Sequence, residues 1–85
     1  MIQITIHEDE PISQFIEARA SKSGQTTTEI AEEVVREGFF SLVRVLHEQF
    51  MRGEISQGRM AELLGISRAD LIHLLERMEL PVTNL

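Results

Sequence analysis

The sequence predicts a mainly helical protein whose chain contributes one N-terminal strand to a two-stranded ribbon shared with a second copy. The strand is indicated by Ile2, Ile4 and Ile6, which alternate with polar residues in the period-two pattern of a half-buried strand. The rest of the 85-residue chain shows apolar residues at helical spacing between capping residues and glycines. Because one strand cannot satisfy its own backbone donors and acceptors, we expect two copies to pair antiparallel about a two-fold axis.

The predicted strand ends at an acidic run, residues 8–10. With the isoleucines packed on the helices, Gln3 and Thr5 of both copies point outward. Residues 81–85 offer a second strand within the same chain, but they begin with a proline and show no clear alternation. The dimeric ribbon is therefore the simpler solution.

A first helix is predicted to begin at Pro11, because a proline suits the first turn, where its missing N–H group would have no partner. Gly24 can close this helix in the left-handed conformation. Four apolar residues fall on one face of it: Ile12, Phe15, Ile16 and Ala20.

A second helix is predicted from about Thr27, since Thr26 and Glu29 have the spacing of a capping box. Its expected buried stripe continues in one phase along the sequence: Ile30, Ala31, Val34, Val35, Leu42, Leu46 and Phe50. Gly38 interrupts the stripe. We predict two helices broken near Gly38 and Phe39, with one long bent helix as the alternative.

Two short helices are predicted in the remainder of the chain. Gly53 stops the preceding helix, Ser56 caps the third, and Ser67 with Asp70 caps the last, which ends before Pro81. Residues 56–78 also have the spacing of a helix-turn-helix. The residues that carry this pattern are the small residue Ala61, the turn residue Gly65, and apolar Met60, Leu64, Ile66, Leu71 and Leu74.

The predicted ribbon has the dimensions to enter the major groove of DNA, where short polar side chains read base edges. A glutamine suits adenine, and a threonine can bond a base edge or touch a thymine methyl group. Residues 1–45 resemble the ribbon-helix-helix repressors and antitoxins in this strand, in the first helix, in the turn of residues 23–25 and in the helix opening of residues 26–30.

The ribbon-helix-helix resemblance implies which residues contact DNA. The implied base contacts are Gln3, Thr5 and His7, and the implied phosphate contacts are Thr26, Thr27 and Thr28. Phosphate binding at a helix N-terminus is also expected on physical grounds, because the free N–H groups there attract anions. This chain departs from a strong DNA binder in having no Lys or Arg in the strand. The alternatives are a merely solvated strand face and threonines that only cap a helix.

The C-terminal half resembles a second family, of small uncharacterised prokaryotic proteins regarded as antitoxins. The resemblance covers residues 52–82 and rests on Gly53 to Ser56, Ala61 to Leu63 with Gly65, and Pro81 with Val82. It implies a toxin partner of the PIN-domain nuclease type.

Two other interpretations of the C-terminal half remain open. One is a helical hairpin that only completes the core, and the other is a last helix that reads DNA. The outward face of that helix is expected to present Arg68, Ile72 and His73 to a partner or to DNA. An exposed Ile72 and an apolar tail with Val82 and Leu85 favour a protein interface.

The charge is acidic, with 14 acidic and 8 basic residues and a formal charge of −6. Residues 1–50 hold nine acidic and four basic residues, whereas residues 51–85 hold five and four. Proteins that bind only nucleic acid are usually basic. The acidic balance therefore favours a protein partner in addition to DNA.

Several classes of function are not expected. The chain has no cysteine, so disulfides, thiolate zinc sites and cysteine nucleophiles are excluded. His7, His47 and His73 do not have metal-binding spacing, and no phosphate-binding loop or catalytic motif occurs. We expect no enzyme activity, no cofactor and no metal. The N-terminus lacks the features of a signal peptide, which predicts a cytoplasmic protein.

These observations predict an antitoxin-like, DNA-binding autorepressor of a toxin–antitoxin operon. Residues 1–45 form the homodimerisation and operator-binding module, and residues 46–85 form a helix-turn-helix-like extension that binds the cognate toxin. The alternatives are a protein-interaction module without specific DNA binding and a transcription factor that reads DNA with the C-terminal helix-turn-helix.

Overall fold

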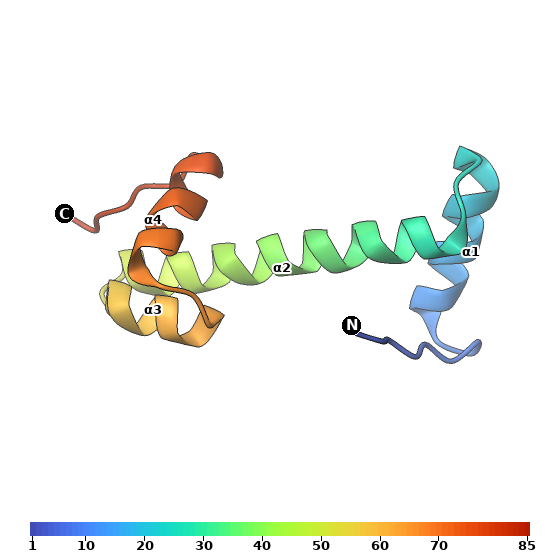
Figure 1. Ribbon diagram of the computed structural model, residues 1–85, viewed down its shortest axis with the longest axis horizontal. Coiled ribbons are helices and arrows are strands. Elements are labelled where there is room, and N and C mark those ends of the chain that lie inside the picture. Colours follow the sequence, from blue (N-terminus) through green and yellow to red (C-terminus); the bar gives the residue numbers. More distant parts are fainter. The chain divides into compact units, whose positions relative to one another are not determined.

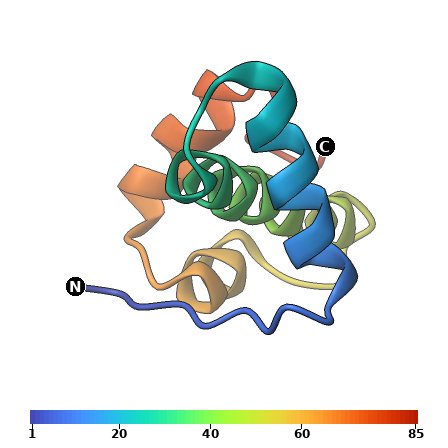
Figure 2. The same ribbon diagram turned by 90° about the vertical axis from the view of Figure 1, so that its right-hand side faces the viewer.

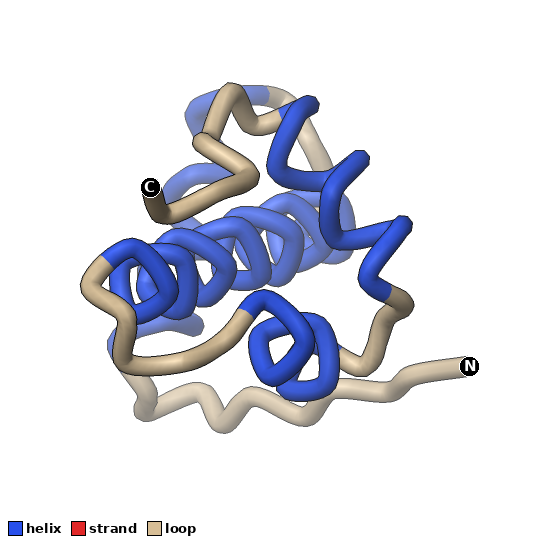
Figure 3. The backbone as a smooth tube through the Cα atoms, turned by 90° about the vertical axis from the view of Figure 1, so that its left-hand side faces the viewer, coloured by secondary structure: helices blue, strands red, loops and turns tan.

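A computed structural model describes residues 1–85, which form four helices and no strand (Figures 1 and 3). The helices are α1 (Pro11–Ser23), α2 (Thr27–Met51), α3 (Gln57–Leu64) and α4 (Arg68–Arg77). The chain divides into two compact units, Met1–Gly38 and Phe39–Leu85. None of the four helices has both the length and the apolar composition needed to cross a lipid bilayer.

The mainly helical prediction is confirmed, but the single chain has no β-strand. Residues 1–7 are irregular and lead into α1 (Figure 2), and residues 81–85 do not form a strand either. The physical reason is that a lone extended segment has no neighbouring strand with which to exchange hydrogen bonds. A ribbon shared with a second copy therefore stays a proposal.

The prediction of a helix break near Gly38 and Phe39 is wrong. Helix α2 runs from Thr27 to Met51 and passes through Gly38 without interruption. A glycine inside a helix costs only about 1 kcal/mol relative to alanine, which is not enough to end a helix held on both sides by packed turns.

Away from Gly38, the predicted helix starts and ends are confirmed. In α1, Pro11 lies in the first turn, and the N–H group of left-handed Gly24 (φ 74°) donates to the Ala20 carbonyl. At α3, the Ser56 hydroxyl accepts from the Arg59 N–H group at 3.0 Å. At α4, the Ser67 hydroxyl accepts from the Asp70 N–H group at 3.1 Å. The two serine hydroxyls satisfy donors that a helix leaves free at its start, and the Gly24 N–H group satisfies a carbonyl that a helix leaves free at its end.

The unit Met1–Gly38 has a small core. Its buried residues are Ile16, Ala20 and Ile30, with Ile6, Ala31 and Val34 partly buried against them. The predicted burial of Val35 is wrong for the single chain, and Ile12 and Phe15 on the apolar face of α1 are exposed as well. The reason is geometric: two helices and an irregular segment cover only a narrow stripe of each other, narrower than the apolar face that the sequence provides.

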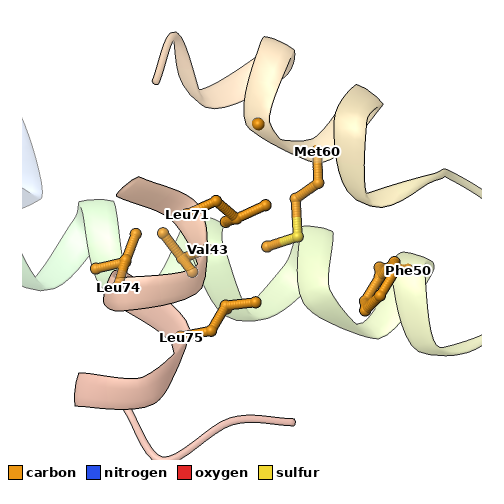
Figure 4. Close-up of a cluster of buried hydrophobic side chains, with 7 residues drawn as sticks. Val43, Phe50, Met60, Leu71, Leu74 and Leu75 are labelled. Atoms are coloured by element: carbon orange, nitrogen blue, oxygen red, sulfur yellow. The ribbon is translucent and has the colours of Figure 1, made fainter. Parts of the chain in front are cut away.

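The unit Phe39–Leu85 has a larger core, formed where α3 and α4 pack with the C-terminal part of α2 (Figure 4). Its buried residues are Val43, Phe50, Met60, Ala61, Leu71, Leu74 and Leu75. The turn between α3 and α4 follows the predicted pattern, with Gly65 left-handed (φ 71°) and the Ile66 N–H group donating to Ala61 at 3.1 Å. Leu42 was expected in the buried stripe but is 62% exposed, since the α3–α4 pair covers only one side of α2.

The C-terminal tail folds back onto this core. His47 Nε2 lies 2.7 Å from the Pro81 carbonyl oxygen, and Gln57 Nε2 donates to the Val82 carbonyl at 2.8 Å. Asn84 Nδ2 donates to the Phe50 carbonyl at 3.2 Å. Val82 is half-buried against the core, so the expectation of a free apolar tail is wrong for this residue.

Candidate DNA-binding and partner-binding surfaces

The N-terminal segment carries the predicted base-reading residues, and Gln3, Thr5 and His7 are all exposed. Among the three isoleucines, Ile6 is partly buried against the core of its unit. Ile2 and Ile4 are 87% and 58% exposed. The segment is therefore anchored at its C-terminal end, while its first two isoleucines are mostly exposed to solvent.

The backbone of this segment is also unpartnered. The N–H groups of residues 2–6 make no hydrogen bond within the chain, and the turn at residues 8–10 begins with a bond from the Glu10 N–H group to the His7 carbonyl at 3.1 Å. Exposed N–H and C=O groups in an extended segment are a template for pairing with another strand.

Two open hollows flank the segment in the unit Met1–Gly38, and Ile4 lines both. The first, of about 340 Å³, is also lined by Ile6, Ile16 and Thr28. The second, of about 450 Å³, is lined by Ile2 and by residues of α2 that include Val35. Both hollows open to solvent. The walls of the second are mostly apolar, whereas the first is also lined by acidic and hydroxyl side chains.

The predicted phosphate site at the start of α2 is shaped by a capping box. The Thr26 hydroxyl accepts from the Glu29 N–H group at 3.1 Å, and the Glu29 carboxylate accepts from the Thr26 N–H group at 3.2 Å. The N–H groups of Thr27 and Thr28 remain as donors for an anion. The Glu29 carboxylate beside them would repel a phosphate, which argues against strong anion binding at this helix start.

Basic residues do not offset that repulsion. The unit Met1–Gly38 holds eight acidic and three basic residues. One of the three, Arg36, lies 3.8 Å from the Glu32 carboxylate, with both side chains largely exposed. Such a pair contributes little to stability, but it lowers the net positive charge around Arg36.

The predicted surface of α4 is only partly free. Arg68 and His73 are exposed, whereas Ile72 is half-buried, so its expected full exposure is wrong. Arg68 Nη2 donates to Gln57 Oε1 at 2.9 Å, and the amide nitrogen of the same Gln57 side chain bonds the tail. Arg68 therefore joins the start of α4 to α3, besides presenting its remaining N–H groups to solvent.

One further cation is held in the loop after α2. Arg52 Nε donates to Glu54 Oε2 at 2.6 Å. This hydrogen bond, and then the negative charge of the carboxylate, raise the pKa of Arg52. No group of three or more His, Asp or Glu side chains is placed to hold a metal ion.

Sequence reasoning missed the side chains that hold the tail: His47, Gln57 and Asn84. Their partners lie 25 to 34 residues away in the chain. No local motif marks such pairs, although a histidine in phase with a buried helix face is a weak signal for an internal hydrogen bond.

Comparisons of the chain with protein-family models, with curated proteins and with solved structures found no match.

Proposed function

We propose that this chain is an antitoxin-like, DNA-binding autorepressor of a toxin–antitoxin operon, which binds its operator as a homodimer. The observation that carries the proposal is the N-terminal segment, where Ile2 and Ile4 are exposed and the backbone is unpartnered. Burying one isoleucine stabilises an association by roughly 1.5–3 kcal/mol. A soluble chain that exposes two of them beside open hollows is suited to a complementary surface.

A second copy of the same segment can cover the exposed isoleucines and pair with the free backbone groups. Antiparallel pairing about a two-fold axis satisfies the backbone groups of both segments at once. It also places Ile2 and Ile4 of both copies over the helices and turns Gln3 and Thr5 outward, since side chains alternate along a strand.

The outward face of that ribbon is the proposed operator-binding surface. Gln3 and Thr5 read base edges in the major groove, with His7 at the end of the ribbon. Phosphates are held by the N–H groups of Thr27 and Thr28. Because the unit is acidic, binding is weak and falls steeply with salt.

The C-terminal unit is proposed to engage the toxin, of the PIN-domain nuclease type that the resemblance of residues 52–82 implies. Support comes from exposed side chains on α3 and α4 that the fold does not use, such as Leu63 and His73. The unit Met1–Gly38, with its excess of acidic residues, also attracts a basic partner.

A second candidate function is an interaction module without a specific DNA target. The observation that favours it is the charge of the unit Met1–Gly38, whose N-terminal segment contains no Lys or Arg. In that case the ribbon holds two copies together, and Gln3 and Thr5 are only its solvated face.

The test is a selection of fragmented genomic DNA from the source organism by the purified full chain at moderate salt, followed by sequencing. We expect enrichment of a short two-fold-symmetric site beside the protein's own gene. The double variant Gln3→Ala, Thr5→Ala should lose this enrichment and stay dimeric. The control Arg68→Ala, His73→Ala should keep it.

Each other outcome identifies a different function. Enrichment that survives the ribbon variant but is lost in the α4 control would mean that the last helix reads DNA. No enrichment by the unaltered chain would favour the interaction module.

A further inference from the structure

Gln57, the first residue of α3, holds the C-terminal tail and is itself held by α4. Its Nε2 donates to the Val82 carbonyl at 2.8 Å, and its Oε1 accepts from Arg68 Nη2 at 2.9 Å. A guanidinium can only donate and a carbonyl can only accept, so the two neighbours fix which end of the amide faces which partner. One chain of hydrogen bonds therefore joins α4, α3 and the tail, and all of it lies within the unit Phe39–Leu85.

The tail is held firmly at its start and lightly beyond it. His47, which is buried, has its Nε2 2.7 Å from the Pro81 carbonyl oxygen. Val82 is only half-buried, and residues 83–85 are exposed. Exposed Asn84 adds one hydrogen bond, at 3.2 Å. Segments with few buried apolar contacts open at a low free-energy cost, so residues 82–85 can leave the core while the rest of the unit stays folded.

Arg68 is the exposed end of this chain of hydrogen bonds. It is the first residue of α4, and its side chain forms no ion pair within the chain, unlike that of Arg59, which pairs with Glu62. The neutral Gln57 amide is its hydrogen-bond partner. A carboxylate or phosphate of another molecule binds a guanidinium more strongly than an amide oxygen does, so such a group can draw Arg68 away from Gln57.

We propose that Gln57 is a positioning residue that links the start of α4 to the tail, so that residues 82–85 open when Arg68 is drawn away. Without the guanidinium, the Gln57 amide loses its fixed orientation and holds the Val82 carbonyl for less of the time. The coupling is reciprocal, so an open tail also frees Arg68 for a partner. It lies within one chain and does not depend on the ribbon of the proposed function.

The test measures how far the tail is open from the NMR chemical shifts of the Val82 methyl groups in the full chain. A free peptide of residues 79–85 gives the shifts of a fully open tail. Arg68→Ala imitates complete withdrawal of the guanidinium, and Arg59→Ala is the matched control, because each removes one exposed arginine from the unit. We expect Arg68→Ala to raise the open-to-closed ratio about fivefold, as the loss of one hydrogen bond does, and Arg59→Ala to leave it within about twofold.

Variants of Gln57 show whether the effect of Arg68 passes through this side chain. Gln57→Met keeps a side chain of similar length without either hydrogen bond, and Gln57→Glu keeps the acceptor for Arg68 but loses the donor to Val82. Both should open the tail. Gln57→Glu should do so without weakening α3, since a negative charge in the first turn stabilises a helix. In the Gln57→Met background, the further change Arg68→Ala should have no additional effect.

Two results would overturn the proposal. One is a tail that stays closed in Arg68→Ala. The other is equal opening by Arg68→Ala with and without the Gln57 side chain, because Arg68 would then act by another route. If a Gln57 variant does not fold, as judged by far-UV circular dichroism, the comparison of Arg68→Ala with Arg59→Ala still decides whether Arg68 holds the tail.

Discussion

The two units of the chain differ in how far each completes its own core. Phe39–Leu85 buries seven apolar residues and closes its core with a tail held by three side-chain hydrogen bonds. Met1–Gly38 buries three and leaves Ile2, Ile4, Phe15 and Val35 exposed. The C-terminal unit therefore covers most of its apolar residues with its own elements, whereas the N-terminal unit leaves a large part of its apolar surface uncovered.

The largest expected effect is on the stability of the C-terminal unit. Leu71 is fully buried in its core, and Leu71→Ala should lower the free energy of unfolding by about 3 kcal/mol, because it leaves a cavity. The matched change Leu42→Ala, at an exposed leucine, should cost less than about 1 kcal/mol. Chemical denaturation followed by far-UV circular dichroism suits a chain without Trp or Tyr. Equal losses in both variants would mean that the core is not where we place it.

In the N-terminal unit, the second largest effect is expected on dimer formation rather than on folding. Ile4→Glu should raise the dimer dissociation constant by about 100-fold, since a charge cannot be buried under the ribbon. The monomer itself should keep its helices, because Ile4 is mostly exposed within the chain. Light scattering across a dilution series measures the constant. A variant that unfolds instead would contradict the view that Ile4 serves a second copy.

Removing a hydrogen bond to the tail should have a smaller effect, which is a loss of stability of the C-terminal unit. His47 is buried and its Nε2 lies 2.7 Å from the Pro81 carbonyl oxygen, so His47→Ala should cost about 2 kcal/mol through lost packing and an unpaired carbonyl. His73→Ala, at an exposed histidine, should change the free energy of unfolding by less than about 0.5 kcal/mol. The same denaturation series measures both. If the two variants lose similar amounts of free energy of unfolding, the tail does not help to stabilise the core.

The smallest predicted effect is a gain. Glu79 has a left-handed backbone (φ 58°) just after α4, and Glu79→Gly should stabilise the unit by about 0.5–1 kcal/mol, since only glycine adopts this conformation without steric cost. Glu76→Gly, inside α4, should destabilise by a similar amount. Neither variant should change the dimer dissociation constant. Thermal unfolding measures both variants. If both changes lower the unfolding temperature, the prediction for Glu79 is wrong.

Short-range features of the fold could be predicted from the sequence. The capping serines at positions 56 and 67, the capping box of Thr26 and Glu29, and the left-handed Gly24 all act over three or four residues. Such hydrogen bonds depend only on residue type and spacing, so the helix starts could be placed correctly.

Long-range features could not be predicted in the same way. The continuity of α2 through Gly38 depends on a balance between glycine's conformational freedom and packing on both sides of it. The exposure of Leu42 and Val35 depends on where neighbouring helices stop covering α2. Periodicity shows which side of a helix is apolar, but it does not show how much of that side a small unit can bury.

The sequence pattern could indicate which residues form the candidate site. It could not indicate which distant residues contact them. Alternation identified Gln3 and Thr5, and both are exposed. The hydrogen bond that ties Arg68 to Gln57 joins residues 11 positions apart in the chain, and no local pattern indicated it. The proposed ribbon requires a second copy, which a single chain does not contain.

The most direct test of the central claim is amide hydrogen exchange of residues 2–6, measured by NMR at a concentration at which the full chain is dimeric. In the single chain these N–H groups have no hydrogen-bond partner. A two-stranded antiparallel ribbon predicts that every second one is protected by about tenfold or more, because alternate residues exchange hydrogen bonds with the partner. Uniformly fast exchange along the whole segment in the dimer would contradict the ribbon.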